Sequence, residues 1–310
     1  MSNPSINNPN NNQQQKSQHC ISFEDVLQAS NRIKSIVHRT PILISSSINQ
    51  LCDDRNLFFK VEAMQRTGSF KFRGACNATL NEVECRMRKS DDVKDAKEGE
   101  EEAKEECIHI VTHSSGNHAA AVALAAREVS NFLLRHEQDN SNCNKSIKIK
   151  STIVMPRNAP IIKVNGVKGF GGNIIAVDNT NEAREEMADI IVEKENATFI
   201  HPSENEFVIA GQGTVCLEMV DQVREVMMSS SEDSSGHAEE FDSRRTELDA
   251  VIIPVGGGGL AAGNTISLRG LLGDKVKVGC LKSIIKPDHS HTKVLLIQLN
   301  LLSQPSLLFM

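Results

Sequence analysis

The chain has 310 residues and a formal net charge of −6, and it contains neither tryptophan nor tyrosine. Residues 91–106 hold nine acidic residues and three lysines, which accounts for the whole net charge. The rest of the chain is neutral overall, without the basic surface or most of the stacking side chains that nucleic-acid binding uses, so we predict no nucleic-acid partner. This length is typical of about two domains.

Eight cysteines are scattered along the chain with no Cys-x-x-Cys pair, which argues against a disulfide framework and a zinc site. The N-terminus lacks the basic and apolar regions of a secretory signal. No apolar run approaches the roughly 18 residues that a membrane span needs. These features predict a cytoplasmic location and no membrane partner.

The first part of the chain changes from polar to patterned sequence. Residues 1–19 are rich in Asn and Gln with almost no apolar side chains, so a disordered tail is predicted. Ser22 opens a helix-capping pattern, and Thr40-Pro41 is predicted to end the helix that follows. An apolar strand is predicted at Leu57–Val61, and a helical pattern follows at Gly74–Leu80.

Three polar stretches at 81–106, 131–150 and 228–247 are interpreted as insertions into one framework, the first of them acidic. Between them, β-branched segments alternate with helical patterns. The predicted strands are Ile108–Thr112, Thr152–Met155, Ile174–Val177, Thr198–Ile200 and Ala250–Val255, and the predicted helices lie near Asn117–Val129, Ile161–Lys168, Asn181–Lys194, Phe207–Met228 and Leu260–Leu271. This alternation predicts an α/β fold of open, twisted, mainly parallel sheets with flanking helices, which bind ligands at the carboxyl ends of their strands.

A lysine with apolar neighbours occupies the motif Thr67–Gly74, between the predicted strand and helix. Lys71 follows a turn-forming Thr-Gly-Ser and is flanked by Phe70 and Phe72. An apolar pocket would disfavour its ammonium form and leave a usable amine nucleophile. The alternative is a snorkelling lysine on a half-buried helix face.

The strand Ile108–Thr112 leads into His113-Ser114-Ser115-Gly116-Asn117-His118 and then an alanine-rich helix. Small polar residues at a helix N-terminus leave backbone N–H groups free to hold an anion such as a carboxylate. An ordinary capping turn is the alternative. The two histidines are five residues apart with no third ligand nearby, so no metal site is predicted.

A second candidate anion site follows the strand Ala250–Val255. There, Gly256, Gly257, Gly258 and Gly259 precede Leu260 and an apolar helix, so their amides can converge on a phosphate at the helix N-terminus. The stretch also fits G-x-G-x-x-A, the pattern of a dinucleotide site. That site expects an acidic residue about 20 positions further on, where this chain has Lys275 and Lys277.

A phosphate cradle, an anion-holding turn and a desolvated lysine together describe a site for pyridoxal phosphate. The lysine would form the Schiff base and the glycines would hold the phosphate. The serine–asparagine turn would take the substrate carboxylate and the substituents of the ring.

Four motifs in the same order resemble the serine racemase and serine/threonine dehydratase family of fold-type II pyridoxal-phosphate enzymes, whose fold is like that of the tryptophan synthase β subunit. They are Thr67–Gly74, His113–His118, Ile209–Thr214 and Pro254–Gly259. The resemblance extends from about Cys20 to Val278 and implies racemisation of L-serine, with elimination from L-serine or L-threonine as a second activity.

The resemblance also implies roles for single residues. Lys71 is the Schiff-base lysine and Phe70 packs by the cofactor, while Asn117 contacts the ring hydroxyl. Gly256, Gly257, Gly258, Gly259 and Leu260 bind the phosphate. Ser115 is the second base opposite Lys71, and Ser114, Ser115, Gly116, Asn117 and His118 bind the amino-acid substrate.

The sequence departs from the family in its effector sites and at its C-terminal end. Ser45, Ser46 and Thr67 resemble ATP contacts, but Ala120 stands where glutamine is expected and Arg66 replaces a lysine. After Val278, the family's cation-binding carboxylates and the serine that faces the pyridine nitrogen are absent. The resemblance therefore predicts neither ATP nor Mg²⁺ or Ca²⁺ as a cofactor, and it predicts exposed sheet edges in an incomplete domain.

The resemblance gives a domain division as well. A large domain is expected from residues 20–106, with the acidic insertion 81–106, and residues 204–310, and a small domain from 107–203. If the family fold is complete, a homodimer is expected. Two other functions remain open: a non-catalytic binding module that keeps the fold, and a nucleotide-binding oxidoreductase that uses the glycine loop.

Overall fold

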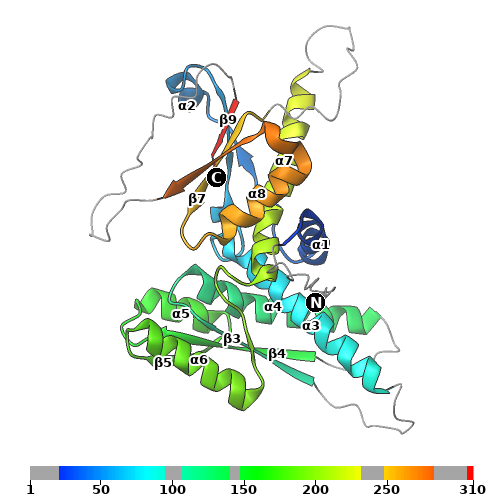
Figure 1. Cartoon of the computed structure of the whole chain (residues 1–310), viewed down its shortest axis with the longest axis vertical. Coiled ribbons are helices and arrows are strands. Elements are labelled where there is room, and N and C mark those ends of the chain that lie inside the picture. The colour runs from blue at the N-terminus through cyan, green and yellow to red at the C-terminus, as the bar shows by residue number, and fades with distance from the viewer. Residues whose placement is uncertain (1–20, 95–105, 140–146, 232–247, 283–305, 310) are drawn as a thin grey trace, which may run out of the picture.

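A computed structural model describes residues 21–94, 106–139, 147–231, 248–282 and 306–309 (Figure 1). The described chain forms a four-stranded and a five-stranded sheet with flanking helices. Every strand pair is parallel except β1 (Ile42–Leu43) with β2 (Asn56–Lys60). The predicted α/β fold with two mainly parallel sheets is confirmed. The domain boundaries stay predictions.

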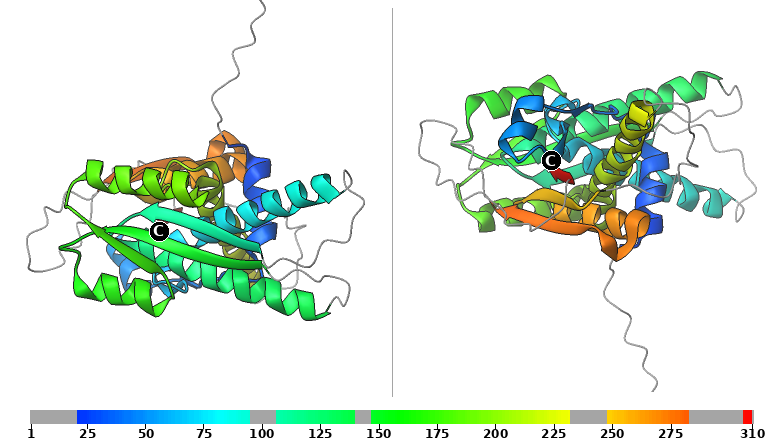
Figure 2. Two further views of the ribbon diagram at one scale, coloured as in Figure 1. Left: turned by 90° about the horizontal axis from the view of Figure 1, so that it is seen from below. Right: turned by 90° about the horizontal axis from the view of Figure 1, so that it is seen from above.

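The four-stranded sheet has the order β5-β4-β3-β6. Its strands are β3 (Glu106–His113), β4 (Ile147–Pro156), β5 (Asn173–Val177) and β6 (Thr198–Phe199). Ile110 packs in one core with α4 (Asn117–Asp139), and its neighbour Val111 packs in another with α6 (Asn181–Glu195). Successive side chains of a strand point to opposite faces, so helices cover both sides of this sheet (Figure 2).

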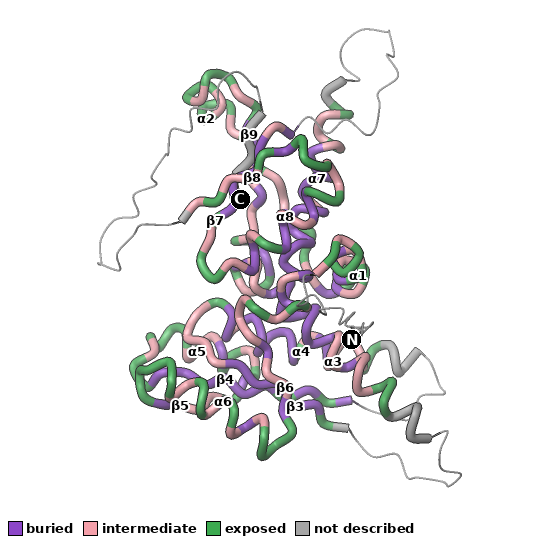
Figure 3. Tube along the Cα trace, in the orientation of Figure 1, coloured by how far each residue is buried: buried purple, intermediate pink, exposed green. Residues whose placement is uncertain are grey.

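The five-stranded sheet has the order β1-β2-β9-β7-β8. Here β7 (Ala250–Val255) pairs with β8 (Lys277–Lys282), and β9 (Ser306–Phe309) lies between β2 and β7, parallel to both. The sequence predicted no element after Lys282, so this central strand is a new finding. Phe58 shares a core with residues of α7 (Glu206–Ser231) and α8 (Gly259–Leu272), and α7 is largely buried in Figure 3.

Glycines bring three helices close together. A Cβ added at Gly211 of α7 would lie 2.6 Å from the Cα of Gly74 in α3 (Lys71–Lys94). A Cβ added at Gly213 would lie 2.8 Å from the carbonyl oxygen of Gly263 in α8. Because only glycine permits these approaches, α7 holds the helix that begins with Lys71 beside the helix that begins at the glycine loop.

The predicted cap of α1 (Phe23–Ile33) is present, since Ser22 Oγ accepts a hydrogen bond from Asp25 N and the Asp25 carboxylate accepts one from Ser22 N. The predicted end at Thr40-Pro41 is wrong, because the helix ends at Ile33. Side chains from elsewhere bind the backbone of the next residues: Gln65 bonds to both the N–H and the carbonyl of His38. Those groups therefore do not serve a helix.

The shorter elements are α2 (Ser46–Leu51), α5 (Ile161–Gly169) and the 3₁₀ turns η1 (Glu62–Met64) and η2 (Gly273–Lys275). None of the described helices is long and apolar enough to cross a membrane.

The predicted insertions are shorter than expected at their described ends. Helix α3 continues to Lys94 with Val83 buried, and α4 continues to Asp139 with Leu133 packed on its core. Strand β4 already begins at Ile147, where buried and exposed side chains alternate. The predictions failed because a few apolar side chains in a polar stretch are enough to extend a packed element. The remainders, 95–105, 140–146 and 232–247, lie outside the described residues, as do the predicted tail 1–19 and residues 283–305.

Candidate active site

Lys71 is the first residue of α3 and is half-buried. Its Nζ donates a hydrogen bond to the carbonyl oxygen of Pro202 at 2.7 Å and lies 5.4 Å from the centre of the Phe70 ring. Burial lowers the pKa of the Lys71 amine below its ordinary value. The amine is therefore held in an environment that favours the neutral, nucleophilic form, and it is not a lysine that snorkels to solvent.

The turn before Lys71 carries hydroxyl groups without partners. Gly68 has a φ of +72°, a left-handed conformation that favours glycine, and its N–H bonds to Gln65 O at 2.7 Å. Thr67 Oγ1 and Ser69 Oγ are buried and have no hydrogen-bond partner among the described residues. Buried hydroxyl groups usually have a partner, so these two are available to a bound molecule.

Residues 200–203 follow β6 and leave the sheet beside the end of β3. The carbonyl oxygen of Ile200 accepts hydrogen bonds from Thr112 Oγ1 at 2.8 Å and from His118 Nε2 at 3.2 Å. Burial lowers the pKa of His118 to about 3, so its ring is neutral. Because Nε2 donates to a carbonyl, Nδ1 carries a free lone pair, and it has no partner among the described residues. His118 can therefore accept a hydrogen bond through Nδ1.

The predicted anion-holding turn lies at the start of α4. Ser114 N donates to Val154 O at 3.2 Å, and Ser114 Oγ accepts from Gly116 N at 3.2 Å. Ser115 is half-buried, whereas Asn117 is exposed. Ser114 thus shapes the turn as well as lying at the predicted substrate position.

The Asn117 amide has a partner that sequence reasoning missed. Lys163 on α5 donates from Nζ to Asn117 Oδ1 at 3.3 Å. Helices α4 and α5 follow the neighbouring parallel strands β3 and β4, so their first turns meet at one edge of the sheet. That adjacency was the signal that could have revealed Lys163.

The glycine loop has one packed side and one open side. A Cβ added at Gly257 would lie 2.8 Å from Ser203 Oγ, and one added at Gly259 would lie 3.1 Å from Ser203 O. A Cβ added at Gly256 or Gly258 would meet no atom of the described chain within 4 Å. Gly258 has a φ of +90° and caps the 14-residue helix α8. The open side therefore fits a phosphate group at a helix N-terminus.

Residues 200–203 connect three of the predicted motifs. His118 contacts the carbonyl of Ile200, Lys71 contacts the carbonyl of Pro202, and the glycine loop packs on Ser203. His201 Nδ1 accepts hydrogen bonds from the backbone N–H groups of residues 203 and 204 and so fixes this turn. Sequence reasoning noted Ser203 only as a departure from the family, and it missed the contacts of Ile200 and Pro202.

The remaining predicted residues have packing roles in the structure or none that the contacts define. Leu260 lies in the core under the glycine loop, and the Ile209–Thr214 motif forms the helix crossing of α7. The described residues contain no group of three His, Cys, Asp or Glu side chains placed to hold a metal ion. Asp274, the acid nearest to the position expected for a dinucleotide site, is almost fully exposed and pairs with Arg269 at 3.0 Å.

Taken together, these residues fit pyridoxal phosphate. An amine with a lowered pKa, an open glycine cradle and buried polar atoms without partners surround the same turn. Such a group would be held by Lys71 at one end and by the N-terminus of α8 at the other.

Comparison with known proteins agrees with this fit. Residues 33–133 and 142–283 match the family described as pyridoxal-phosphate dependent enzyme. The chain is 35% identical over 246 residues to serine racemase from Arabidopsis thaliana, covering 79% of this chain and 56% of that protein. It is 37% identical over 254 residues to serine racemase from Homo sapiens, covering 82% and 58%. The chain thus spans less than two thirds of the length of these relatives.

Solved structures give the same picture. Maize serine racemase aligns with a TM-score of 0.60 at 34% identity, covering 84% of this chain and 61% of that one. A bacterial-strain threonine deaminase, from T.th., aligns with a TM-score of 0.59 at 29% identity, covering 84% and 65%. The resemblance to serine racemase and the dehydratases is therefore confirmed, and the chain belongs to the family of pyridoxal-phosphate-dependent enzymes.

Proposed function

We propose that this protein is a serine racemase that interconverts L-serine and D-serine with pyridoxal phosphate bound at Lys71. The observation that carries the proposal is the meeting of Lys71 and the open glycine cradle at Pro202 and Ser203. Pyridoxal phosphate, when bound, supplies an electron sink that makes the α-proton of an amino acid removable. The chain must then hold the phosphate and the substrate and move that proton.

Racemisation needs a proton carrier on each side of the substrate. Lys71 Nζ serves as one, since its lowered pKa gives it a lone pair near neutral pH and Pro202 O orients it. Ser115 Oγ, at the start of α4, serves as the other. The N–H groups of that helix start bind the substrate carboxylate, and His118 Nδ1 accepts a hydrogen bond from a bound donor.

Elimination is the second activity that we propose. Loss of the serine hydroxyl as water, followed by hydrolysis, yields pyruvate and ammonia from the same deprotonated substrate; L-threonine would yield the corresponding keto acid. The similarity to threonine deaminase supports this part. We also propose that the protein acts on small amino acids in the cytoplasm as a homodimer.

The lysine assignment is tested by absorbance. Addition of pyridoxal phosphate to the purified chain should produce an imine band that is lost in Lys71→Ala. The same band should persist in Lys168→Ala, which removes an exposed lysine of α5. An unchanged band in Lys71→Ala would overturn the assignment.

The racemase assignment is tested by separating the two products. Ser115→Ala should abolish D-serine formation while pyruvate formation survives, because only inversion needs a proton carrier on the second side. Equal loss of both products would show that Ser115 is not that carrier. Absence of any turnover in a chain that binds the cofactor would favour a non-catalytic module.

A further inference from the structure

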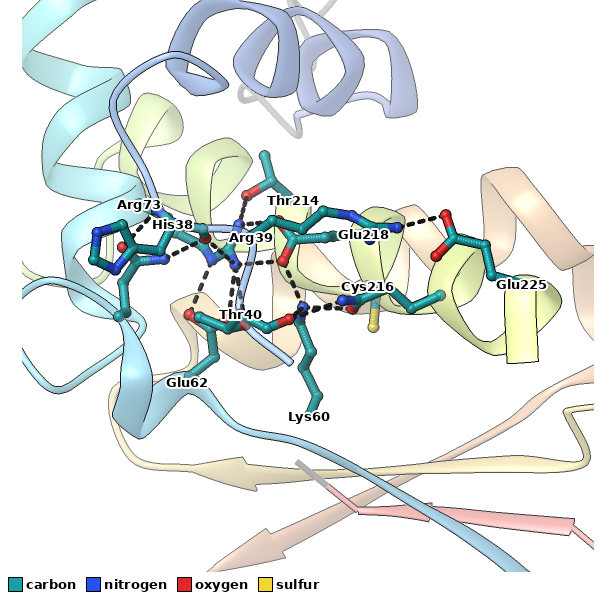
Figure 4. A network of polar contacts seen from close by, with 12 residues as sticks. His38, Arg39, Thr40, Lys60, Glu62, Arg73, Thr214, Cys216, Glu218 and Glu225 are labelled. Atoms are coloured by element: carbon teal, nitrogen blue, oxygen red, sulfur yellow. Dashed lines mark hydrogen bonds and ion pairs between the residues drawn. The ribbon is translucent and has the colours of Figure 1, made fainter. Parts of the chain in front are cut away.

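Arg73 is the residue of the Lys71 motif that the proposed function leaves unused. It lies two positions after Lys71, yet its side chain is only 1% exposed. Its guanidinium donates to both oxygens of Glu62, at 2.9 and 2.8 Å. It also donates to both oxygens of Glu218 on α7, at 3.0 and 3.1 Å, as Figure 4 shows. Arginine thus binds two carboxylates with its planar fork.

A second buried cation completes this network. The Lys60 side chain is fully buried, and its Nζ donates to Glu218 Oε1 at 2.5 Å, to Thr40 O at 2.7 Å and to Gln222 Oε1 at 2.7 Å. Thr40 Oγ1 in turn donates to Glu62 Oε1 at 2.6 Å. Two cations and two carboxylates therefore balance, and every member is hydrogen-bonded.

The network joins segments that are far apart in the sequence. It connects the loop at Thr40, strand β2, the turn η1 and helix α7 to the first turn of α3. Buried ion pairs of this kind add little net stability, because desolvation offsets their attraction. A purely stabilising role would be served as well by apolar side chains, so the geometry that the network imposes is its more informative property.

The first turn of α3 needs such support. Its leading N–H groups have no partners within a helix. Phe72 N reaches Ser69 O only at 3.5 Å, and Arg73 N reaches Phe70 O at 3.1 Å. Lys71 lies in this turn, and its Nζ must reach Pro202 O to lie beside the glycine loop.

We propose that Arg73 is a positioning residue: its double clamp on Glu62 and Glu218 holds the first turn of α3 so that Lys71 Nζ stays at Pro202 O. This inference rests on the proposed role of Lys71 as the cofactor lysine. It assigns no contact between Arg73 and the substrate or cofactor.

The test separates position from stability. Arg73→Gln leaves two carboxylates against Lys60, so both unfolding midpoint and imine formation should fall. The double variant Arg73→Gln/Glu62→Gln leaves the neutral pair Lys60–Glu218 and should regain much of the unfolding midpoint. Imine formation in it should stay about tenfold or more slower than in the unaltered chain, because small displacements of a reacting group cost that much. Recovery of both together would overturn the proposal.

A second readout needs no cofactor. The reactivity of Lys71 towards an acylating reagent, followed by mass spectrometry across pH, reports the pKa of its amine. In the double variant that pKa should rise towards the ordinary lysine value, while exposed Lys168 stays unchanged. An unaltered Lys71 profile would overturn the positioning role. If the unaltered chain forms no imine, the proposed function fails, and the labelling still decides the role of Arg73.

Discussion

The two sheets are built in different ways. All strands of the four-stranded sheet come from residues 106–199, and each of its strands lies close in sequence to its neighbours. The five-stranded sheet is assembled from residues 42–60, 250–282 and 306–309, with the last strand in its centre. Pairing over such distances requires closure of long loops before any contact forms. The site lies where the two assemblies meet, at residues 200–203.

The largest expected effect tests whether both sheets have equally packed cores. Ile110 of β3 and Ile253 of β7 are both fully buried. Replacement of either by alanine should lower the free energy of unfolding by about 2–5 kcal/mol, since each leaves a cavity. Denaturant unfolding of the two variants measures this directly. A cost below about 1 kcal/mol for Ile253→Ala alone would show that the five-stranded sheet is loosely packed.

An intermediate effect is expected where the sheets differ most, at β9. Leu308 pairs with Phe58 on one side and Val251 on the other. Leu308→Pro removes a backbone donor from this central strand, which should cost about 1–3 kcal/mol and lower hydrogen-exchange protection in β2 and β7. Protection in β3 and β4 should stay unchanged. Leu308→Val, which keeps the donor, is the matched control; equal protection in both variants would contradict the role of β9.

The smallest effect concerns pH and the junction at Ile200. His118 has a folded pKa of about 3 against an ordinary value of 6.5, so the unfolded chain binds a proton that the folded chain does not. Its contribution to stability is therefore complete above pH 6.5 and is lost as pH falls towards 3, at about 1.4 kcal/mol per pH unit.

Unfolding measured between about pH 7 and 5 checks this sign. His118→Asn should flatten the dependence, whereas His113→Asn should flatten it less, since burial lowers the pKa of the less buried His113 as well. A steeper dependence in His118→Asn would contradict the neutral ring.

Sequence patterns identified what depends on nearby residues. The strand at Ala250–Val255, the glycine loop after it and the unusual environment of Lys71 all follow from local alternation and turn residues. Long-range contacts were not predictable in this way. Nothing local in Ser306–Phe309 indicates its partners, and Arg73 and Lys60 find their carboxylates only after α7 packs beside α3.

Ser203 has a further consequence for the glycine loop. Gly257 and Gly259 rest on this one residue, while their neighbours Gly256 and Gly258 face open space. Residue 203 therefore acts as a spacer beneath the loop, and its size sets how far the amides stand above the turn at Pro202. A larger side chain at 203 would require the loop to shift outward, so the size of this residue and the depth of the phosphate cradle have to change together.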